Sequence, residues 1–440
     1  MDTVRQKTCP DCFKGILESG KCNRCGFEIQ HEKQNSLRIE TFSKLKQRYI
    51  VGRILGYGGF GITYKVYDTK QDRICAVKEF IPMGLVARRS QGTQIYVTSS
   101  AYEGDFEHGK KRFIEEARVL MQLDHIPEVV KITDYFEENN TAYFVMDYIE
   151  GATLKQLMRV YGGTIPLKNA LEIIKQAGEA LEQVHTGAGI FHRDISADNI
   201  MLTKDGNVKI IDFGNAKYLI GKNSQTLSVV LKHGYAPPEQ YSSTSLQGSY
   251  TDVYALAVTL YYILTGVMVT SAPDRLTGEE YWALNRVLPE VPEYVSKAVD
   301  RALELNSKKR TQTVRQFLTE LGLSEQASVS KKKKQETPYI AVIGTDSRRR
   351  FNLPCNSIMT IGRSKTMADI VPARDSQISK KHCEIFYDSI EQQFYLVDQS
   401  TNGTYLDGQR MEKGKVYVIR AGERFSLGRN LCILQTGVEK

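Results

Sequence analysis

The chain has 440 residues, of which 41% are hydrophobic and 25% charged. This length predicts two or three domains, and the composition is typical of globular proteins, which excludes a chain that is mainly disordered. The net charge is +8, and part of it is local, in the run of four lysines at residues 331–334. A basic balance of this kind suits nucleic acid or phosphorylated partners, although a solvated linker explains the lysine run best.

The first segment, residues 1–30, contains half of the eight cysteines in two C-x-x-C pairs. The four are Cys9, Cys12, Cys22 and Cys25. Two such turns can hold four thiolates at tetrahedral spacing, and the segment resembles a zinc ribbon. It is too small to fold without a metal, so we expect a structural Zn²⁺ with no open coordination position. A pair of disulfides is the alternative, which the lack of a secretory signal after Met1 disfavours.

A polar stretch at residues 31–46 is predicted to be a linker, and residues 47–323 are predicted to form the next domain. This domain opens with the G-x-G-x-x-G loop of Gly56, Gly58 and Gly61. Glycines allow backbone amides to approach phosphate oxygens without obstruction from a Cβ atom. A Rossmann nucleotide-binding fold is the alternative, but it needs a helix directly after the glycines, whereas residues 62–67 favour a strand.

Four further motifs follow in the same domain. They are Ala76-Val77-Lys78, a helical pattern with Glu115 and Glu116, His192-Arg193-Asp194 with Asn199 after it, and Asp212-Phe213-Gly214. In this order and at this spacing they resemble the signature of protein kinases over about 275 residues. The resemblance implies a two-lobed fold that transfers the γ-phosphate of ATP to Ser or Thr hydroxyls of protein substrates, with Mg²⁺ or Mn²⁺ as the metal.

The resemblance also implies a role for each motif. Asp194 would orient the substrate hydroxyl and accept its proton, whereas Asn199 and Asp212 would hold Mg²⁺ against the phosphates. Lys78 would position the nucleotide, with the second glutamate, Glu116, as its ion-pair partner and the first as the alternative. The nucleotide would also lie beside the gatekeeper and hinge positions, Met146, Asp147 and Tyr148.

Two later landmarks are similar to those of the same family. Ala236-Pro237-Pro238-Glu239 stands where kinases carry an Ala-Pro-Glu motif, and its glutamate would pair with Arg310. Asp252 would open the long buried helix of the large lobe. That helix accounts for the apolar stretch at residues 253–269, which at 17 residues is at the short limit for crossing a bilayer. We therefore expect no membrane span.

Three features depart from the family pattern. Ser196 stands two residues after the catalytic aspartate, where Ser/Thr kinases usually carry a lysine close to the transferring phosphate. Thr63 replaces the usual valine above the adenine, and an insertion whose role the sequence does not reveal occupies roughly residues 82–109. The missing lysine leaves two alternatives open, a pseudokinase scaffold and a dual-specificity kinase. The residues assigned to catalysis are all present, which favours an active enzyme.

Arg193 predicts control by phosphorylation, because an arginine before the catalytic aspartate can bind a phosphate on the activation segment and order it. The candidate acceptors in that segment are Ser224, Thr226 and Ser228. An ordinary polar loop is the alternative interpretation of these three residues.

A Ser- and Lys-rich linker at residues 324–338 is predicted to lead to a last domain at residues 339–440. There, short β-type runs alternate with turns, as in an all-β sandwich. Residues 361–364, 378–383 and 398–404 carry three motifs that resemble those of a forkhead-associated (FHA) domain. The resemblance implies phosphothreonine binding by Arg363, Ser379 and Asn402, which supply a guanidinium fork, a hydroxyl and an amide. Gly362 and His382 are expected to shape the binding loops.

The expected fold class is therefore multidomain α+β, with a zinc ribbon, a two-lobed protein kinase fold and an all-β FHA sandwich. The expected function is that of a cytoplasmic Ser/Thr kinase that phosphorylates itself and other proteins and binds phosphothreonine proteins. Its own phosphothreonines would be one ligand, with Thr226, Thr311 and Thr313 as candidates. A nucleic-acid-binding regulator is the weaker alternative, because the ribbon lacks interleaved aromatic and basic residues.

Overall fold

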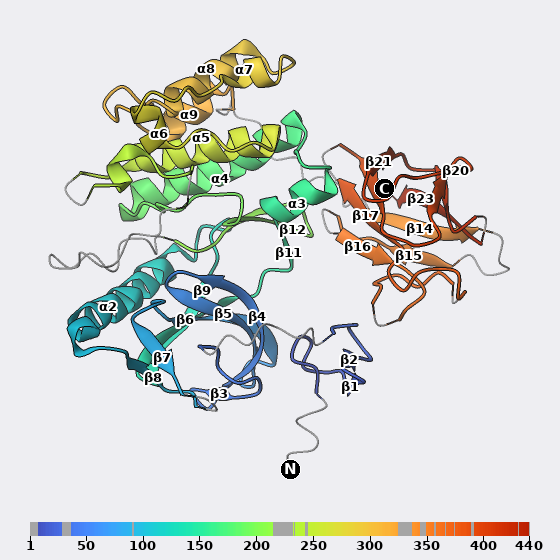
Figure 1. Ribbon diagram of the computed structural model, residues 1–440, viewed down its shortest axis with the longest axis horizontal. Helices are drawn as coiled ribbons and strands as arrows, with labels where there is room; N and C mark the ends of the chain where they lie inside the picture. Colours follow the sequence, from blue (N-terminus) through green and yellow to red (C-terminus); the bar gives the residue numbers. More distant parts are fainter. Residues whose placement is uncertain are drawn as a thin grey trace.

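The computed structural model contains three folded parts, which follow one another along the chain (Figure 1). The residues that it describes are 8–28, 37–89, 92–213, 232, 234–242, 245–323, 337–343, 349–355, 358–365, 367–373, 375–388, 391–429 and 431–439. The first part is a ribbon whose strands are β1 (Leu17–Glu18) and β2 (Lys21–Cys22). The second part has a sheet-rich and a helical lobe, and the third is made of strands, so the predicted fold class is confirmed.

The N-terminal lobe is built on a six-stranded antiparallel sheet with the order β3-β4-β5-β6-β10-β9. Its strands are β3 (Lys44–Leu45), β4 (Tyr49–Gly58), β5 (Gly61–Asp68), β6 (Arg73–Phe80), β9 (Ile132–Glu138) and β10 (Thr141–Asp147). Most side chains of the central strands β6 and β10 are buried on both faces, which suits their content of β-branched and aromatic residues.

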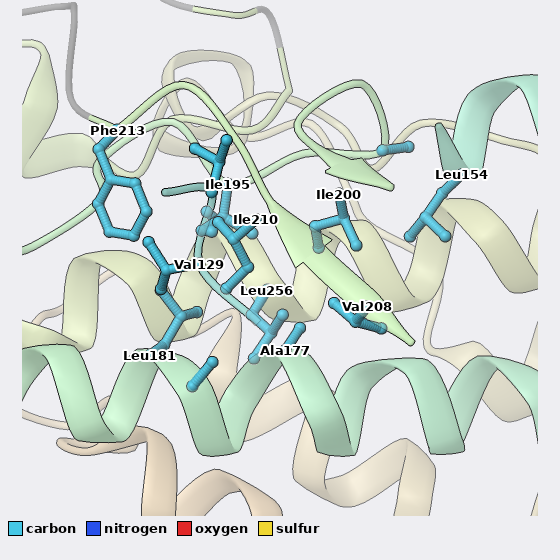
Figure 2. Packing of buried hydrophobic residues seen from close by; sticks show 14 of the residues in the cluster. Val129, Leu154, Ala177, Leu181, Ile195, Ile200, Val208, Ile210, Phe213 and Leu256 are labelled. Atoms are coloured by element: carbon cyan, nitrogen blue, oxygen red, sulfur yellow. The ribbon is translucent and has the colours of Figure 1, made fainter. Parts of the chain in front are cut away.

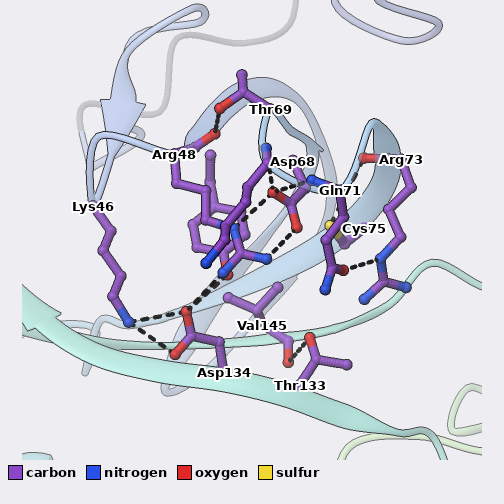
Figure 3. A network of polar contacts seen from close by, with 12 residues as sticks. Lys46, Arg48, Asp68, Thr69, Gln71, Arg73, Cys75, Thr133, Asp134 and Val145 are labelled. Carbon is purple, nitrogen blue, oxygen red and sulfur yellow. Dashed lines mark hydrogen bonds and ion pairs between the residues drawn. The ribbon is translucent and has the colours of Figure 1, made fainter.

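The sheet curls until its first strands meet its last (Figure 3). Lys46, which follows β3, places its ammonium 2.9 Å from the carboxylate of Asp134 in β9, and the Tyr49 hydroxyl donates to the same carboxylate at 2.8 Å. Arg48 then binds Asp68 of β5 through two hydrogen bonds of 2.7 and 2.6 Å. These contacts hold the strands on either side of the glycine loop in a closed, rigid lobe.

The predicted insertion between Lys78 and the glutamate helix has a structure of its own. It forms a β-hairpin of β7 (Val86–Arg88) and β8 (Ile95–Val97), then a short turn, η1 (Ser100–Tyr102). The helix that follows, α2 (Glu103–Leu120), begins well before the expected end of the insertion. It packs Phe106 and Phe113 against Phe80 of the sheet.

The C-terminal lobe is helical and carries a small sheet of β11 (Gly151–Thr153), β12 (Ile200–Thr203) and β13 (Val208–Ile210). Its helices are α3 (Leu154–Val160), α4 (Leu167–Ala188), α5 (Ser249–Thr265), α6 (Ala272–Leu276), α7 (Leu284–Val287), α8 (Glu293–Ala302) and α9 (Val314–Glu320). The buried residues of α4 recur three or four positions apart, as in an amphipathic helix with one face in the core.

The core of this lobe anchors the segment that carries Asp194. Ala177 and Leu181 of α4 lie under the small sheet, next to Leu256 of α5 (Figure 2). Ile195, which follows Asp194, and Phe213, which follows Asp212, reach into the same cluster, and both are almost completely buried. The backbone on which the polar site residues lie is therefore held from below by apolar packing.

The apolar stretch at residues 253–269 lies mostly in α5, and every side chain from Thr251 to Tyr261 is buried. Among the described residues, no helix is both long enough and apolar enough to span a bilayer. The prediction of a buried helix at this stretch is confirmed.

The third part is a sandwich of two sheets. One has the order β15-β14-β23-β22-β19-β20, and the other has the order β16-β17-β18-β21. The strands are β14 (Thr337–Ile343), β15 (Arg350–Asn352), β16 (Ile358–Ile361), β17 (Cys383–Asp388), β18 (Gln393–Asp398), β19 (Thr404–Leu406), β20 (Gln409–Arg410), β21 (Val416–Ile419), β22 (Arg424–Leu427) and β23 (Cys432–Glu439). Between the sheets lies a separate apolar core that includes Ile385, Leu396 and Leu434.

The sandwich packs against the C-terminal lobe beside α3 (Figure 1). Tyr161, at the end of α3, inserts its ring edge-on between Phe386 and Tyr395, with ring centroids 5.2 and 4.8 Å away. Its hydroxyl donates to the carboxylate of Asp388 at 2.8 Å, and the amide of Asn169 in α4 donates to the same carboxylate. The four-stranded sheet is therefore covered on both faces, by its own core and by the helical lobe.

Candidate active site

A cleft of about 870 Å³ separates the two lobes of the second part. All nine residues predicted to bind the nucleotide line it, namely Gly56, Gly58, Gly61, Lys78, Met146, Asp147, Tyr148, Asn199 and Asp212. Asp194 lines the cleft as well, and so does Thr63, which replaces the usual valine of the family. The structure thus brings together residues that lie up to 156 positions apart in the sequence, from Gly56 to Asp212.

The glycine loop is the turn between β4 and β5, where Gly58 pairs with Gly61. A Cβ atom at Gly61 would lie 2.5 Å from the carbonyl oxygen of Glu79, so this position needs glycine for the close approach of two strands. At Gly56 a Cβ atom would meet nothing, and at Gly58 it would meet only one atom, at 3.8 Å. A strand follows the glycines, as predicted, which rules out the Rossmann alternative.

Lys78 of β6 pairs with the aspartate of the Asp212-Phe213-Gly214 motif. Its ammonium is 2.7 Å from Asp212, which has a left-handed backbone conformation with φ of 58°. Burial alone would raise the pKa of Asp212, but the charge of Lys78 outweighs this effect and lowers the pKa below its ordinary value. The predicted ion pair of Lys78 with Glu116 is not among the ion pairs of the described residues.

Of the two candidate glutamates, Glu115 is exposed on α2, whereas Glu116 faces inward. The Oε2 atom of Glu116 is buried and has no hydrogen-bond partner. Burial raises the pKa of Glu116 to about 8, against which the charge of Lys78 acts. The structure therefore favours Glu116 over Glu115 as a candidate partner of Lys78, although the ion pair between Lys78 and Glu116 is not formed in this structure.

The strand that carries Lys78 is fixed by a buried polar cluster, which the sequence did not reveal. Glu79 points away from the cleft, is fully buried, and accepts hydrogen bonds from Tyr64 at 3.0 Å and Tyr143 at 2.6 Å. Arg88 from the inserted hairpin forms an ion pair with it. One structural role of the insertion is therefore to neutralise the carboxylate next to Lys78.

The loop that carries Asp194 is held by hydrogen bonds on both sides. The Asn199 amide donates to the main-chain oxygen and to the carboxylate of Asp194, both at 2.8 Å. Burial raises the pKa of Asp194 above its ordinary value, and the nearby His192 and Lys232 act in the opposite direction. A carboxylate with a raised pKa and a fixed orientation suits a group that accepts a proton during reaction.

Asp252, the first acidic residue of α5, anchors the same loop from inside the lobe. Its carboxylate accepts hydrogen bonds from the backbone amides of His192 and Arg193, both at 2.7 Å, and one of its oxygens lies 2.8 Å from a ring nitrogen of His185. The placement of Asp252 at the start of a buried helix agrees with the sequence prediction.

The predicted pair of Glu239 and Arg310 is confirmed. Two hydrogen bonds of 2.6 and 3.1 Å join the carboxylate to the guanidinium, and both residues are buried. Next to it, Gln240 donates from its amide to the main-chain oxygen of Arg193 at 2.8 Å. The segment around Glu239 is thereby tied to the catalytic loop.

The four predicted zinc ligands come together at the tip of the ribbon, with their sulfur atoms within 4.8 Å of one another. Two of the sulfur pairs are 3.5 and 3.7 Å apart. A tetrahedron with Zn–S bonds of about 2.3 Å has edges of about 3.8 Å, so the arrangement fits Zn²⁺. Backbone amides of Asp11, Gly15, Arg24 and Cys25 donate to these sulfurs at 3.3–3.4 Å, as expected for thiolates.

The ribbon is docked on β4, directly before the glycine loop. Asp11, between the first two cysteines, forms ion pairs with Arg53 of β4 and with Lys65 of β5, the latter at 2.9 Å. The main-chain oxygen of Pro10 accepts a hydrogen bond of 3.0 Å from the amide of Arg53. The ribbon thus contacts the strand that leads into the nucleotide cleft.

In the sandwich, the three predicted phosphothreonine-binding residues lie on neighbouring loops. Ser379 accepts from the amide of Thr401 at 3.1 Å, and the amide of Asn402 donates to the main-chain oxygen of Gln377 at 2.7 Å. The Nε atom of Arg363 is buried and has no hydrogen-bond partner. A guanidinium group with a free donor suits an anionic ligand.

The two residues expected to shape these loops do so. His382 is buried and joins them, with its ring nitrogens 3.1 Å from the amide of Ser379 and 3.0 Å from the main-chain oxygen of Gly403. Gly362 packs so tightly that a Cβ atom there would lie 2.1 Å from the main-chain oxygen of Lys380.

Comparison with known proteins decides the family. Residues 49–321 match the protein kinase domain, and residues 359–428 match the FHA domain. The first match covers more than half of the chain. The chain belongs to the protein kinase family. The FHA domain predicted from three loop motifs is confirmed by the second match.

Bacterial serine/threonine kinases are among the relatives of this kinase. It is 33% identical to PrkC of Bacillus subtilis over 267 residues, which are 59% of this chain and 38% of PrkC. It is 34% identical to PknB of Mycobacterium leprae over 234 residues, which are 52% of this chain and 34% of PknB. The chain thus matches less than two fifths of the length of either relative.

Solved structures agree on the fold. The apo form of PpkA-294 has a TM-score of 0.58 at 30% identity, and the match covers 65% of this kinase and 100% of that chain. A point mutant of the PknI kinase domain from Mycobacterium tuberculosis has a TM-score of 0.50 at 23% identity, and the match covers 65% of this kinase and 98% of that chain. The second likeness concerns the fold alone.

Some predicted residues lie outside the described part of the chain. They are Gly214 and the candidate phosphorylation sites Ser224, Thr226 and Ser228. Two polar residues around the site were not found from the sequence, namely Arg88, which pairs with Glu79 behind Lys78, and Lys232 beside the catalytic loop. No motif spacing identifies them, because each belongs to a segment between the family motifs.

Proposed function

We propose that this chain is an ATP-dependent Ser/Thr kinase whose FHA domain binds phosphothreonine, either in substrates or in the chain itself. The observation that carries the proposal is the convergence of Lys78, Asp194, Asn199 and Asp212 on one cleft beneath a glycine loop. The names of the two relatives compared above, both bacterial serine/threonine kinases, support the substrate class.

In this proposal Asp194 accepts the proton of a substrate hydroxyl while the hydroxyl oxygen forms a bond to the γ-phosphorus of ATP. The bond between that phosphorus and the bridging oxygen breaks, and ADP leaves. Asn199 and Asp212 hold Mg²⁺, which neutralises phosphate charge when bound. Lys78 contacts the α- and β-phosphates and exchanges Asp212 for Glu116 as its carboxylate partner.

The alternative proposal is a pseudokinase scaffold that binds phosphoproteins without catalysis. It rests on Ser196, which leaves the catalytic loop without its usual cation. The raised pKa of Asp194 and its two hydrogen bonds from Asn199 speak against it, because a scaffold has no need of an oriented proton acceptor.

Phosphate transfer from labelled ATP with Mg²⁺, to the chain itself and to a generic basic protein, tests the proposal. Asp194→Asn keeps the shape of the site but cannot take the proton, so we expect a loss of at least about 100-fold in rate. Nucleotide affinity should stay within about threefold of the unaltered chain, because Asp194 contacts the acceptor and not the adenine. Equal labelling by both proteins would contradict the assignment, and no labelling by either would favour the scaffold.

A phosphothreonine peptide library tests the FHA proposal separately. Arg363→Ala removes the guanidinium with the free donor, so phosphopeptide binding should be lost while phosphoryl transfer to the generic protein stays unchanged. Arg350→Ala is the matched control, since Arg350 lies on the same domain, is exposed, and pairs with Glu439 instead. Retained binding in Arg363→Ala would refute the assigned site.

We also infer that the ribbon holds Zn²⁺ and that the protein works in the cytoplasm. The converging thiols at the tip support a structural metal over disulfides. A reducing compartment keeps such thiols available for the metal. Metal analysis of protein purified without added zinc, with about one Zn²⁺ per chain as the expected value, tests the first of these inferences.

A further inference from the structure

The position expected to carry the catalytic-loop lysine is occupied by Ser196, which is fully buried and neutral. The structure nevertheless places an ammonium group there. Lys232 donates from Nζ to the hydroxyl of Ser196 at 2.8 Å, although it is 36 residues further along the chain. Lys232 also lines the same cleft as Asp194 and Lys78.

Lys232 is held in place from several directions. Its ammonium lies 2.5 Å from the carboxylate of Asp198 and 5.4 Å from the ring centroid of Tyr235. Its main-chain oxygen accepts a hydrogen bond of 3.0 Å from the amide of Tyr235, which is itself buried. About a third of the side chain is exposed (32%), so the ammonium retains access to the cleft.

The local charge balance leaves a positive charge available. Asp198 is contacted not only by Lys232 but also by Lys155, at 3.4 Å. Two ammonium groups therefore face the carboxylate of Asp198, so this trio has one excess positive charge, and Lys232 also acts on the carboxylates of Asp194 and Asp212. An incoming phosphoryl group that carries negative charge would meet this excess.

We propose that Lys232 is a catalytic residue. It lies in the segment before Glu239 and supplies the cation that is absent from position 196. Its ammonium would contact the phosphoryl group during transfer, and the hydroxyl of Ser196 would orient it. The hydrogen bond between the two side chains places a lysine from the later segment where the catalytic loop itself supplies only a hydroxyl. This inference rests on the proposed kinase activity.

The origin of this cation has a consequence for control. A lysine on the catalytic loop would be present in the site whether or not the following segment is ordered. Lys232 reaches the site only when it and residues 234–240 lie as they do here, with Gln240 bonded to the oxygen of Arg193. The ammonium of Lys232 is therefore in the site only when the segment around Gln240 is docked on the catalytic loop, so this docking controls the rate.

Steady-state kinetics of the full chain with ATP and a generic protein substrate test the proposal. Lys232→Ala, and Lys232→Met, which keeps the stem, should lower kcat by about 100-fold, because a cation at the developing charge is lost. The KM for ATP should change by less than about threefold. Lys204→Ala is the control, since Lys204 forms a surface ion pair of similar length, 2.6 Å to Glu150, and does not line the cleft.

The exchanged variant Ser196→Lys/Lys232→Ser separates a catalytic role from a structural one. It returns the cation to the catalytic loop, so its kcat should be at least about tenfold higher than that of the Lys232 variants. If Lys232 only supported folding, a lysine at position 196 would not recover kcat. Unchanged kcat in both Lys232 variants would overturn the proposal. A lowered kcat without recovery in the exchanged variant would overturn it too. If the unaltered chain itself transfers no phosphate, the kinase function fails first and the role of Lys232 falls with it.

Discussion

Lys78 pairs with Asp212, and the pKa values of Asp212 and Glu116 shift in opposite directions. Asp212 carries its charge and holds the ammonium at 2.7 Å, whereas burial raises the pKa of Glu116 to about 8. Mg²⁺ bound to Asp212 would compete with Lys78 for the carboxylate. A nucleotide complex therefore favours transfer of Lys78 to Glu116, which would then lose its proton.

The raised pKa of Glu116 predicts a pH dependence of stability. The folded chain binds this proton up to about pH 8, whereas the unfolded chain releases it near the ordinary value of 4.5. The stabilising contribution is therefore complete below pH 4.5 and is lost as the pH rises to about 8, by up to about 1.4 kcal/mol per pH unit. Glu116→Gln, which keeps the shape and cannot titrate, should lack this slope.

Unfolding of the nucleotide-free chain, followed from about pH 6 to about pH 9, measures the difference between the two proteins. Parallel stability curves for Glu116→Gln and the unaltered chain would contradict the assigned pKa. Added ATP and Mg²⁺ should reduce the difference, because Lys78 then stabilises the ionised carboxylate.

At this scale the sequence predicted the cleft residues because the family signature fixes both residue type and spacing. It did not identify Lys232, since a cation can replace another in space from any position of the chain. It chose Glu116 but kept Glu115 as the alternative, because which of two adjacent helical residues faces inward depends on the rotation of α2. Nothing in the sequence indicates that Glu116 lacks its ion pair with Lys78 in this structure.

Among the elements, the inserted hairpin has the clearest structural role. Its Arg88 is the only guanidinium group in the described residues that pairs with the buried Glu79. Removal of one partner leaves the other charge buried without compensation, which costs about 3–5 kcal/mol, whereas removal of both costs less. Arg88→Met should therefore destabilise the N-terminal lobe strongly, and Glu79→Gln/Arg88→Met should restore part of the loss.

Urea titration of nucleotide binding reports the unfolding of this lobe in both variants. The expected order of midpoints is unaltered chain, double variant, then Arg88→Met. A midpoint for Arg88→Met equal to that of the unaltered chain would show that Glu79 is neutral in the folded lobe.

The ribbon is the second element with an effect on the cleft, because Asp11 connects it to β4 and β5. Chelation of Zn²⁺ should unfold the ribbon, release Arg53 and Lys65, and weaken ATP binding several-fold. Asp11→Asn should weaken ATP binding similarly while the metal content stays the same. Calorimetric titration with ATP, together with metal analysis, distinguishes the two cases. Unaltered ATP affinity after complete removal of Zn²⁺ would contradict the coupling.

Sequence patterns predicted the buried helix α5, through its apolar stretch and the family resemblance, and the β-rich tail, through its alternating runs and turns. The hairpin of residues 86–97 was not predicted, because its strands have only three residues each and depend on contacts of Arg88 with Leu37 and Glu79, which lie outside the hairpin. Short strands of this kind are stabilised by tertiary contacts more than by propensity.

For the whole molecule, Tyr161 sets the position of the FHA domain relative to the helical lobe. Tyr161→Ala removes both ring contacts and the hydrogen bond to Asp388, so the two domains should separate. Small-angle X-ray scattering should show a larger radius of gyration. Lys168→Ala is the control, because Lys168 is exposed and its ion pair with Glu391 is 3.8 Å long, so it contributes little. Identical scattering from Tyr161→Ala and the unaltered chain would refute the interface.

This interface also affects how the FHA domain can be studied in isolation. Strands β17 and β18 are buried on both faces, unlike those of a sandwich with one face in water. A fragment that starts at residue 337 would expose Phe386 and Tyr395 to solvent, and such an uncovered aromatic surface promotes self-association. Peptide affinities measured with that fragment would describe an aggregate or dimer, so the recognition loops are best measured while still attached to the lobe that shields the sheet.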